Sequence, residues 1–178
     1  MPKLLTTFVM GVFALFAIFA TVTFFKTLTP AITAPTLTQK DISLEQAMEI
    51  AQAAVDECKK SDSAVTVAVV DRVGAIRFAV RATGATPDDL EAARRLAYTA
   101  RTFRGPTSGW IERTTPGKDP VSLIGQRQLE NTLAKAGGVP ILLNGDAIGG
   151  IGVRGSKGDD MGDEACATAG VKAVDGNL

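Results

Sequence analysis

The dipeptide Asn144-Gly145 constrains the fold more than any other feature of this sequence, because it stands between two runs of β-forming residues. Both residue types accept the left-handed backbone of a two-residue turn, so the pattern predicts a hairpin with strands over 139–143 and 147–153. A second hairpin is predicted around the turn sequence DRVG at 71–74. Strands joined by tight turns are antiparallel neighbours, so an antiparallel sheet is the expected centre of the fold.

Gly150, Gly152 and Gly155 have the Gly-x-Gly-x-x-Gly spacing of a dinucleotide-binding loop. Such a loop needs a second parallel strand after its helix, and we expect too few residues before Leu178 to form one. The first two glycines also fall inside a predicted hairpin strand. They share one face of it and leave that face flat, so a helix, a neighbouring subunit or a flat ligand is expected to approach closely. No nucleotide cofactor is expected.

Four helical segments are expected around the hairpins. A capping box formed by Ser43 and Gln46 starts the first, over 41–60. Thr86 is the expected N-cap of the second, which extends to residue 103. The third is short and ends at Trp110, and the fourth, over 159–174, has acidic residues at its start, where the helix dipole favours them. Helices packed on an antiparallel sheet predict an α+β domain.

The N-terminal stretch Leu4–Phe25 contains no charged residue and is about as long as a bilayer-spanning helix requires. We expect an uncleaved signal anchor over 1–26, with a cleaved signal peptide as the alternative. A flexible linker over 27–41 and a folded domain over 42–178 follow. The membrane is then a partner of the N-terminal helix. The domain is expected to be periplasmic or extracytoplasmic, tethered to the inner membrane.

Charge balance and the absence of histidine exclude several functions. The 19 basic residues are matched by 19 acidic ones, which argues against a nucleic-acid partner. Without histidine the chain has no Ser-His-Asp triad, no Cys-His pair and no histidine-ligated zinc or haem. A metal site at the acidic residues of 159–164 is not expected, because their spacing does not fit an EF-hand loop. A binding protein is favoured over an enzyme.

The two cysteines, Cys58 and Cys166, each fall on the apolar face of a predicted helix. This placement is compatible with two buried thiols or with a disulfide that joins the first and last helices. The disulfide would suit an exported domain, since such bonds persist in oxidising compartments.

Four stretches together resemble one known family: the hairpin AVTVAVVDRVGAIRFAVRATGA, and the segments ARRLAYTARTFRGPTS, GGVPILLNGDAIGGIGVRG and GDDMGDEACATAG. They are similar to the GlcG-like haem-binding family, also called the haem-degrading domain, over about Leu44 to Val174. The resemblance implies a profilin-like sandwich, with a five-stranded antiparallel sheet flanked by helices, and a homo-oligomer. It also implies haem as a cofactor. Two positions depart from the family pattern, where Asp88 replaces a common histidine and Leu96 a common lysine.

The candidate haem-binding residues lie in and just after the second predicted helix. They are Tyr98, Thr107, Arg94, Arg101, Arg104, Phe103 and Trp110. Guanidinium groups suit haem propionates or any small anionic carboxylate, and a phenolate can bind ferric haem. The competing interpretations are solvated arginines, a helix-capping Thr107, a Tyr98 in the core or a subunit interface, and aromatic residues in ordinary packing.

Three functional hypotheses follow. The first is an exported or membrane-anchored haem-binding protein that stores or senses haem or assists its breakdown. The second is a small organic-acid binding protein or enzyme that uses arginines as carboxylate clamps. The third is an oligomeric scaffold without a ligand.

Overall fold

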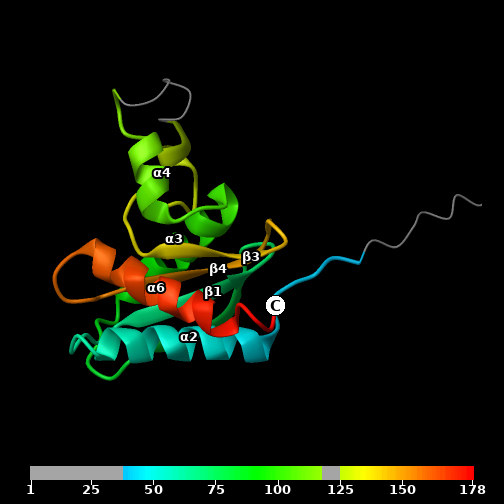
Figure 1. Ribbon diagram of the computed structural model, residues 1–178. Helices are drawn as coiled ribbons and strands as arrows, with labels where there is room; N and C mark the ends of the chain where they lie inside the picture. The colour runs from blue at the N-terminus through cyan, green and yellow to red at the C-terminus, as the bar shows by residue number, and fades with distance from the viewer. Residues whose placement is uncertain (1–37, 118–124) are drawn as a thin grey trace, which may run out of the picture. The chain divides into compact units, whose positions relative to one another are not determined.

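Four antiparallel strands form one sheet in the part of the chain that the structure, a computed structural model, describes, which is residues 38–117 and 125–178 (Figure 1). The strands are β1 (Thr66–Asp71), β2 (Ile76–Arg81), β3 (Gly138–Leu143) and β4 (Asp146–Arg154), in the spatial order β2-β1-β4-β3. The prediction of five strands is therefore wrong for the described residues. The segment before β3 instead forms a 3-10 turn, η1 (Gly125–Gln128), followed by turns.

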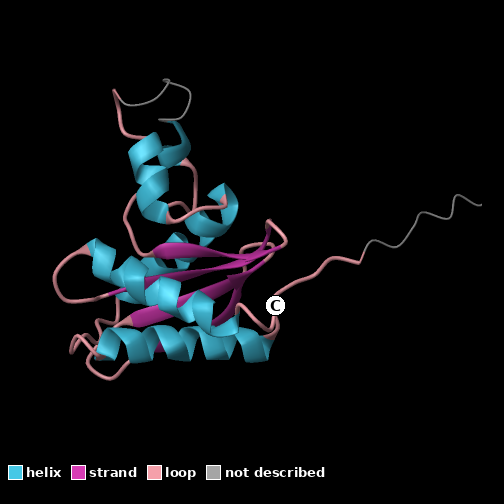
Figure 2. Cartoon of the chain, in the orientation of Figure 1, coloured by secondary structure: helices cyan, strands magenta, loops and turns pink. Residues whose placement is uncertain are grey.

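Helices cover both faces of this sheet. They are α2 (Leu44–Lys59), α3 (Asp89–Phe103), α4 (Thr107–Arg113) and α6 (Asp160–Val174). α2 and α6 pack side by side on one face, and α3 packs on the other, with the short α4 beyond it (Figures 1 and 2). The predicted α+β class is confirmed.

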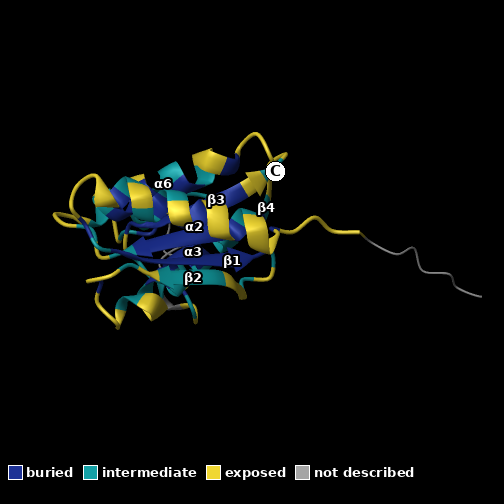
Figure 3. Ribbon diagram, turned by 90° about the horizontal axis from the view of Figure 1, so that it is seen from below, coloured by how far each residue is buried: buried dark blue, intermediate teal, exposed yellow. Residues whose placement is uncertain are grey.

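The hydrophobic core lies between the sheet and the pair α2–α6. Val67 and Val69 of β1 and Ile151 and Val153 of β4 point into it, as the two-residue period of a strand requires. β1 is buried along its whole length, whereas the edge strand β2 is only partly covered (Figure 3). The run of apolar residues Val67–Val70 thus identifies β1 as a strand in the middle of the sheet.

The opposite face of the sheet is flat, and α3 lies directly on it. A Cβ atom added to Gly150 would stand 2.4 Å from the Ala97 carbonyl oxygen, and one added to Gly152 would stand 2.0 Å from that of Ala93. The backbone of α3 is therefore what approaches the two glycines. Gly150 and Gly152 therefore serve helix packing, whereas Gly155, with φ 108°, lies in the turn after β4.

Most of the turns and helix caps predicted from the sequence are present in the structure. Asn144 and Gly145 both have positive φ angles and join β3 to β4, and Ser43 and Gln46 form the capping box of α2. The Thr86 cap is wrong, because a turn precedes the helix and α3 begins at Asp89, with Asp88 at the N-cap.

A disulfide between Cys58 and Cys166 joins α2 to α6. The sequence was compatible with two buried thiols or with this disulfide, and the structure contains the disulfide. The buried hydrophobic residues of the described chain run from Ile42 to Val174, and all lie in the unit Gln39–Leu178. This unit has its own hydrophobic core and its own disulfide, so we expect it to fold independently.

The predicted membrane segment Leu4–Phe25 lies outside the described residues. Within residues 38–117 and 125–178, no helix is both long and apolar enough to cross a bilayer.

Candidate functional site

Three of the candidate residues follow one face of α3. Arg94, Tyr98 and Arg101 are four and three residues apart, so they stand about one helical turn from each other. Arg94 donates two hydrogen bonds to Glu91, at 2.7 and 2.8 Å, and one to Asn131 at 2.8 Å. The hydrogen bond from Arg94 holds the pKa of Glu91 below its ordinary value.

Tyr98 lies where α3 meets the β1–β2 turn. Its ring packs against Gly74, where an added Cβ would stand 2.6 Å from the ring carbon Cδ2. The side chain is half-buried, and its hydroxyl forms no hydrogen bond with the described residues. Within the described part of the chain the phenol oxygen is therefore without a hydrogen-bond partner, and an arginine stands about one helical turn away on either side.

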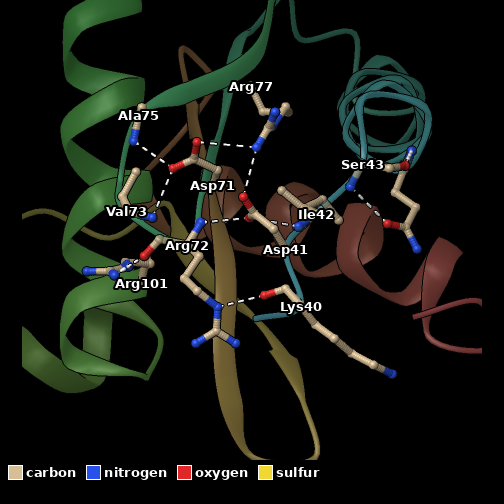
Figure 4. A network of polar contacts seen from close by, with 11 residues as sticks. Lys40, Asp41, Ile42, Ser43, Asp71, Arg72, Val73, Ala75, Arg77 and Arg101 are labelled. Carbon is tan, nitrogen blue, oxygen red and sulfur yellow. Dashed lines mark hydrogen bonds and ion pairs between the residues drawn. The ribbon is translucent and has the colours of Figure 1, made fainter. Parts of the chain in front are cut away.

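The β1–β2 turn that supports Tyr98 is organised by Asp71. One of its carboxylate oxygens, Oδ1, accepts the N–H groups of Val73 at 3.0 Å and Ala75 at 2.9 Å, and the other faces Arg77 at 3.4 Å (Figure 4). Asp41, just before α2, contacts the same guanidinium at 2.8 Å. These contacts fix the turn against the start of the domain.

Asp41 and Lys40 also hold Arg72, in the middle of that turn. Asp41 accepts the Arg72 backbone N–H at 2.9 Å, and the Lys40 carbonyl accepts the side-chain Nε–H at 2.6 Å. The carbonyl of Arg72 in turn accepts a hydrogen bond from Arg101 of α3 (Figure 4). The turn is therefore clamped between α3 and the segment before α2.

Arg104 ends α3 at the other hairpin. It adopts the left-handed conformation that stops the helix, with φ 56°. Its guanidinium donates to the Gly145 carbonyl and, at 3.0 Å, to the Asp146 carboxylate. Both hairpin turns are thus joined to the last turn of α3 by arginines.

These arginines border a small open depression. Its lining is Arg72, Arg101, Thr102, Arg104, Asp146 and Ala147, and its volume is about 240 Å³. The depression is therefore rich in guanidinium groups, which bind carboxylates through paired N–H donors.

The remaining candidates lie where α3 meets α4, and of these Thr107 and Trp110 are buried and Phe103 is half-buried. Thr107 is inaccessible, and its hydroxyl accepts the Gly138 N–H at 2.9 Å and lies 3.3 Å from a Glu164 oxygen. Phe103 and Trp110 stack with ring centroids 4.9 Å apart, and Trp110 is 1% exposed. The structure therefore separates Thr107 and Trp110 from the half-buried face of α3 that carries Arg94, Tyr98 and Arg101.

Glu164, whose carboxylate forms hydrogen bonds at this junction, was not identified from the sequence. It comes from α6, is 7% exposed, and accepts hydrogen bonds from the Ser108 N–H at 3.0 Å and the Ser108 hydroxyl at 2.5 Å. It thereby supplies a carboxylate to the start of α4. The only sequence signal is its place in an acidic run, which the start of α6 already explains.

The other acidic residues at the start of α6 are engaged in the structure. Asp159 caps the helix by accepting the Gly162 N–H at 3.1 Å, and Asp160 and Asp163 both contact Arg154. Burial raises the pKa of Asp163, although Asp163 also accepts the Ser156 N–H at 2.7 Å.

The family model described as haem degrading protein HbpS-like matches residues 42–172 of the chain. The chain belongs to the HbpS-like family. This confirms the resemblance to the GlcG-like haem-binding family. No curated protein matches the chain by sequence.

Solved structures of HbpS-like proteins share this fold. The chain is 33% identical to HbpS, with a TM-score of 0.73, over 82% of this chain and 99% of that one. A double mutant of HbpS from Streptomyces reticuli also gives 33% identity and a TM-score of 0.71, over 82% of this chain and 97% of that one. The PduOC protein, solved in complex with haem, is 23% identical, with a TM-score of 0.67, over 76% of this chain and 96% of that one. This last likeness concerns the fold alone.

Proposed function

We propose that the chain is a haem-binding protein that stores or senses haem or assists its breakdown, and is not itself a catalyst. The observation that carries this proposal is the match of a family model for haem degrading proteins over most of the folded domain. A relative of the same fold was solved with haem bound, which adds support.

The residues of this chain that would hold a haem lie along the half-buried face of α3 that carries Arg94, Tyr98 and Arg101. Tyr98 has a phenol oxygen without a hydrogen-bond partner among the described residues, and phenolate is a known ligand of ferric haem. Arg94 and Arg101 stand one turn to either side and would pair with the two propionates. Thr107 is too buried to reach an iron atom without disrupting α4. Bound haem would supply an iron centre at the protein surface.

A haem titration of the fragment Gln39–Leu178 tests this function. We expect a shifted Soret band at micromolar haem, and its absence would refute the proposal. Tyr98→Phe should change the spectrum because it removes the phenol oxygen. Thr107→Ala is the matched control, since it should lower stability and leave the spectrum unchanged. If Tyr98→Phe leaves the spectrum intact, Tyr98 is not the ligand.

We also propose that the domain works outside the cytoplasm, tethered by the apolar segment Leu4–Phe25. The Cys58–Cys166 disulfide supports this, because such bonds persist in oxidising compartments. Labelling of free thiols in rapidly quenched cells checks the proposal: we expect no free thiol and recovery of the chain with the membrane fraction. Reduced cysteines in the native host would contradict export.

A further inference from the structure

We propose that the depression between the two hairpin turns is a binding site for a carboxylate group, held by Arg72, Arg101 and Arg104. Three arginines line it, and Asp146 is the single acidic residue of the lining. This leaves the site with an excess of positive charge, although the chain as a whole has none. Arginine forks match the geometry of a carboxylate, which makes this anion a natural occupant.

Two buried polar atoms at the depression support the assignment. Arg101 Nε and Thr102 Oγ1 are both buried, and neither has a hydrogen-bond partner in the described structure. Buried polar groups are nearly always paired, because an unmade hydrogen bond costs free energy. Both atoms belong to residues that line the same depression. These two residues therefore carry polar groups beside the depression whose hydrogen bonding the described protein groups do not complete.

The arginines themselves are held in place by backbone groups rather than by acids. Arg101 donates to the carbonyl of Arg72, and Arg72 donates through Nε to the carbonyl of Lys40. Among the described residues, Arg104 alone of the three arginines forms an ion pair, with Asp146 at 3.0 Å. The positive charge of Arg72 and Arg101 therefore remains available to a ligand, and their backbone partners orient both side chains in advance.

The size of the depression restricts the occupant. The depression measures about 240 Å³ and is open to solvent. It accepts a free acid of a few carbon atoms, or one propionate arm of a haem whose ring lies outside. The chemistry is the same in both cases. Only the second source rests on the haem-binding function proposed above.

Thermal unfolding of the fragment Gln39–Leu178 with acetate, succinate and phosphate tests the site, against sodium chloride at equal ionic strength. We expect acetate or succinate at about ten times its Kd to raise Tm by roughly 4 °C. Arg101→Lys and Arg104→Lys keep the charge and remove the fork, so each should weaken binding about tenfold or more. Arg113→Lys, on α4 away from the depression, is the matched control and should have no effect.

Haem titrations of the same variants distinguish the two sources. If the free acids do nothing beyond the salt control, but Arg104→Lys lowers haem affinity about tenfold and Arg113→Lys does not, the carboxylate is a propionate. If the acids stabilise the fragment and haem gives no Soret shift, this site stands and the haem function fails. Stabilisation by phosphate equal to that by the acids would overturn the carboxylate assignment. If the acids have no effect and all variants bind haem with equal affinity, the proposed carboxylate site is overturned.

Discussion

At the scale of single residues, Glu164 shows how one carboxylate can decide the position of a helix. It lies on α6 but receives hydrogen bonds from Ser108 at the start of α4. We expect Glu164→Gln to lower the free energy of unfolding by about 1–3 kcal/mol, because one oxygen becomes an amide donor that faces other donors. Urea unfolding measures the loss.

Glu49→Gln is the matched control for this change. Glu49 is exposed on α2, so its replacement should alter the free energy of unfolding by less than about 0.5 kcal/mol. Equal effects of the two substitutions would show that Glu164 does not hold α4.

The raised pKa of Asp163 predicts an unusual dependence of the domain's stability on pH. Burial raises its pKa in the folded chain above the ordinary value of 3.8, so the folded state holds this proton more tightly than the unfolded state. The stability that Asp163 contributes is therefore fully present below pH 3.8 and is lost as pH rises through the raised pKa. We expect the difference in unfolding free energy between wild type and Asp163→Asn to fall across that window. Urea unfolding at a series of acidic pH values measures it.

Asp62 supplies a control for which the pH dependence of stability has the opposite sign. Its hydrogen bond and ion pair with Lys157 lower its pKa, so its contribution is present above pH 3.8 and is lost as pH falls through the lowered pKa. The difference between wild type and Asp62→Asn should therefore rise with pH. If the Asp163 difference also rises with pH, the ion pair with Arg154 outweighs burial.

At the scale of elements, the contact between α3 and β4 depends on glycines. A Cβ at position 152 would stand 2.0 Å from the Ala93 carbonyl oxygen and 2.7 Å from the Ala97 backbone nitrogen. Because both are backbone atoms, the helix must move as a whole. We expect Gly152→Ala to lower the free energy of unfolding by about 3 kcal/mol or more. Gly176→Ala, where nothing lies within 4 Å, should be nearly neutral in the same chemical unfolding experiment.

The elements were largely predictable because their signals are local. Asn144-Gly145 and the capping box of Ser43 act within four residues, and both appear as predicted. The start of α3 was not predictable in the same way, since Thr86, Pro87 and Asp88 are all plausible at a helix start and only the preceding turn decides among them.

The site was less predictable than the elements, because it depends on contacts between distant segments. The order of residues on α3 shows that Arg94, Tyr98 and Arg101 share a face. No local sequence pattern shows that the carbonyl of Arg72, 29 residues before Arg101, accepts a hydrogen bond from the Arg101 side chain. Thr107 and Trp110 follow Tyr98 and Arg101 closely in the sequence, and only the packing of the folded chain shows that they are buried.

At the scale of the whole molecule, the disulfide closes most of the domain into one loop. Its two cysteines are separated by 108 residues. A loop of about this length is expected to add about 4–5 kcal/mol to the free energy of unfolding, because the cross-link reduces the entropy of the unfolded chain. Urea unfolding of Gln39–Leu178 with and without dithiothreitol measures this contribution.

The double variant Cys58→Ser with Cys166→Ser is the control. It should match the reduced protein, and dithiothreitol should not change its unfolding curve. An identical curve for oxidised and reduced wild type would contradict a stabilising role of the bond.

The same bond changes what a protease can do to this protein. A single cut anywhere between Cys58 and Cys166 divides the polypeptide but does not release a piece, since both halves stay joined through sulfur. A nicked molecule would keep its full mass on a non-reducing gel and separate into two bands only after reduction. If the chain is anchored by its N-terminus, the half that carries α6 would stay at the membrane after such a cut.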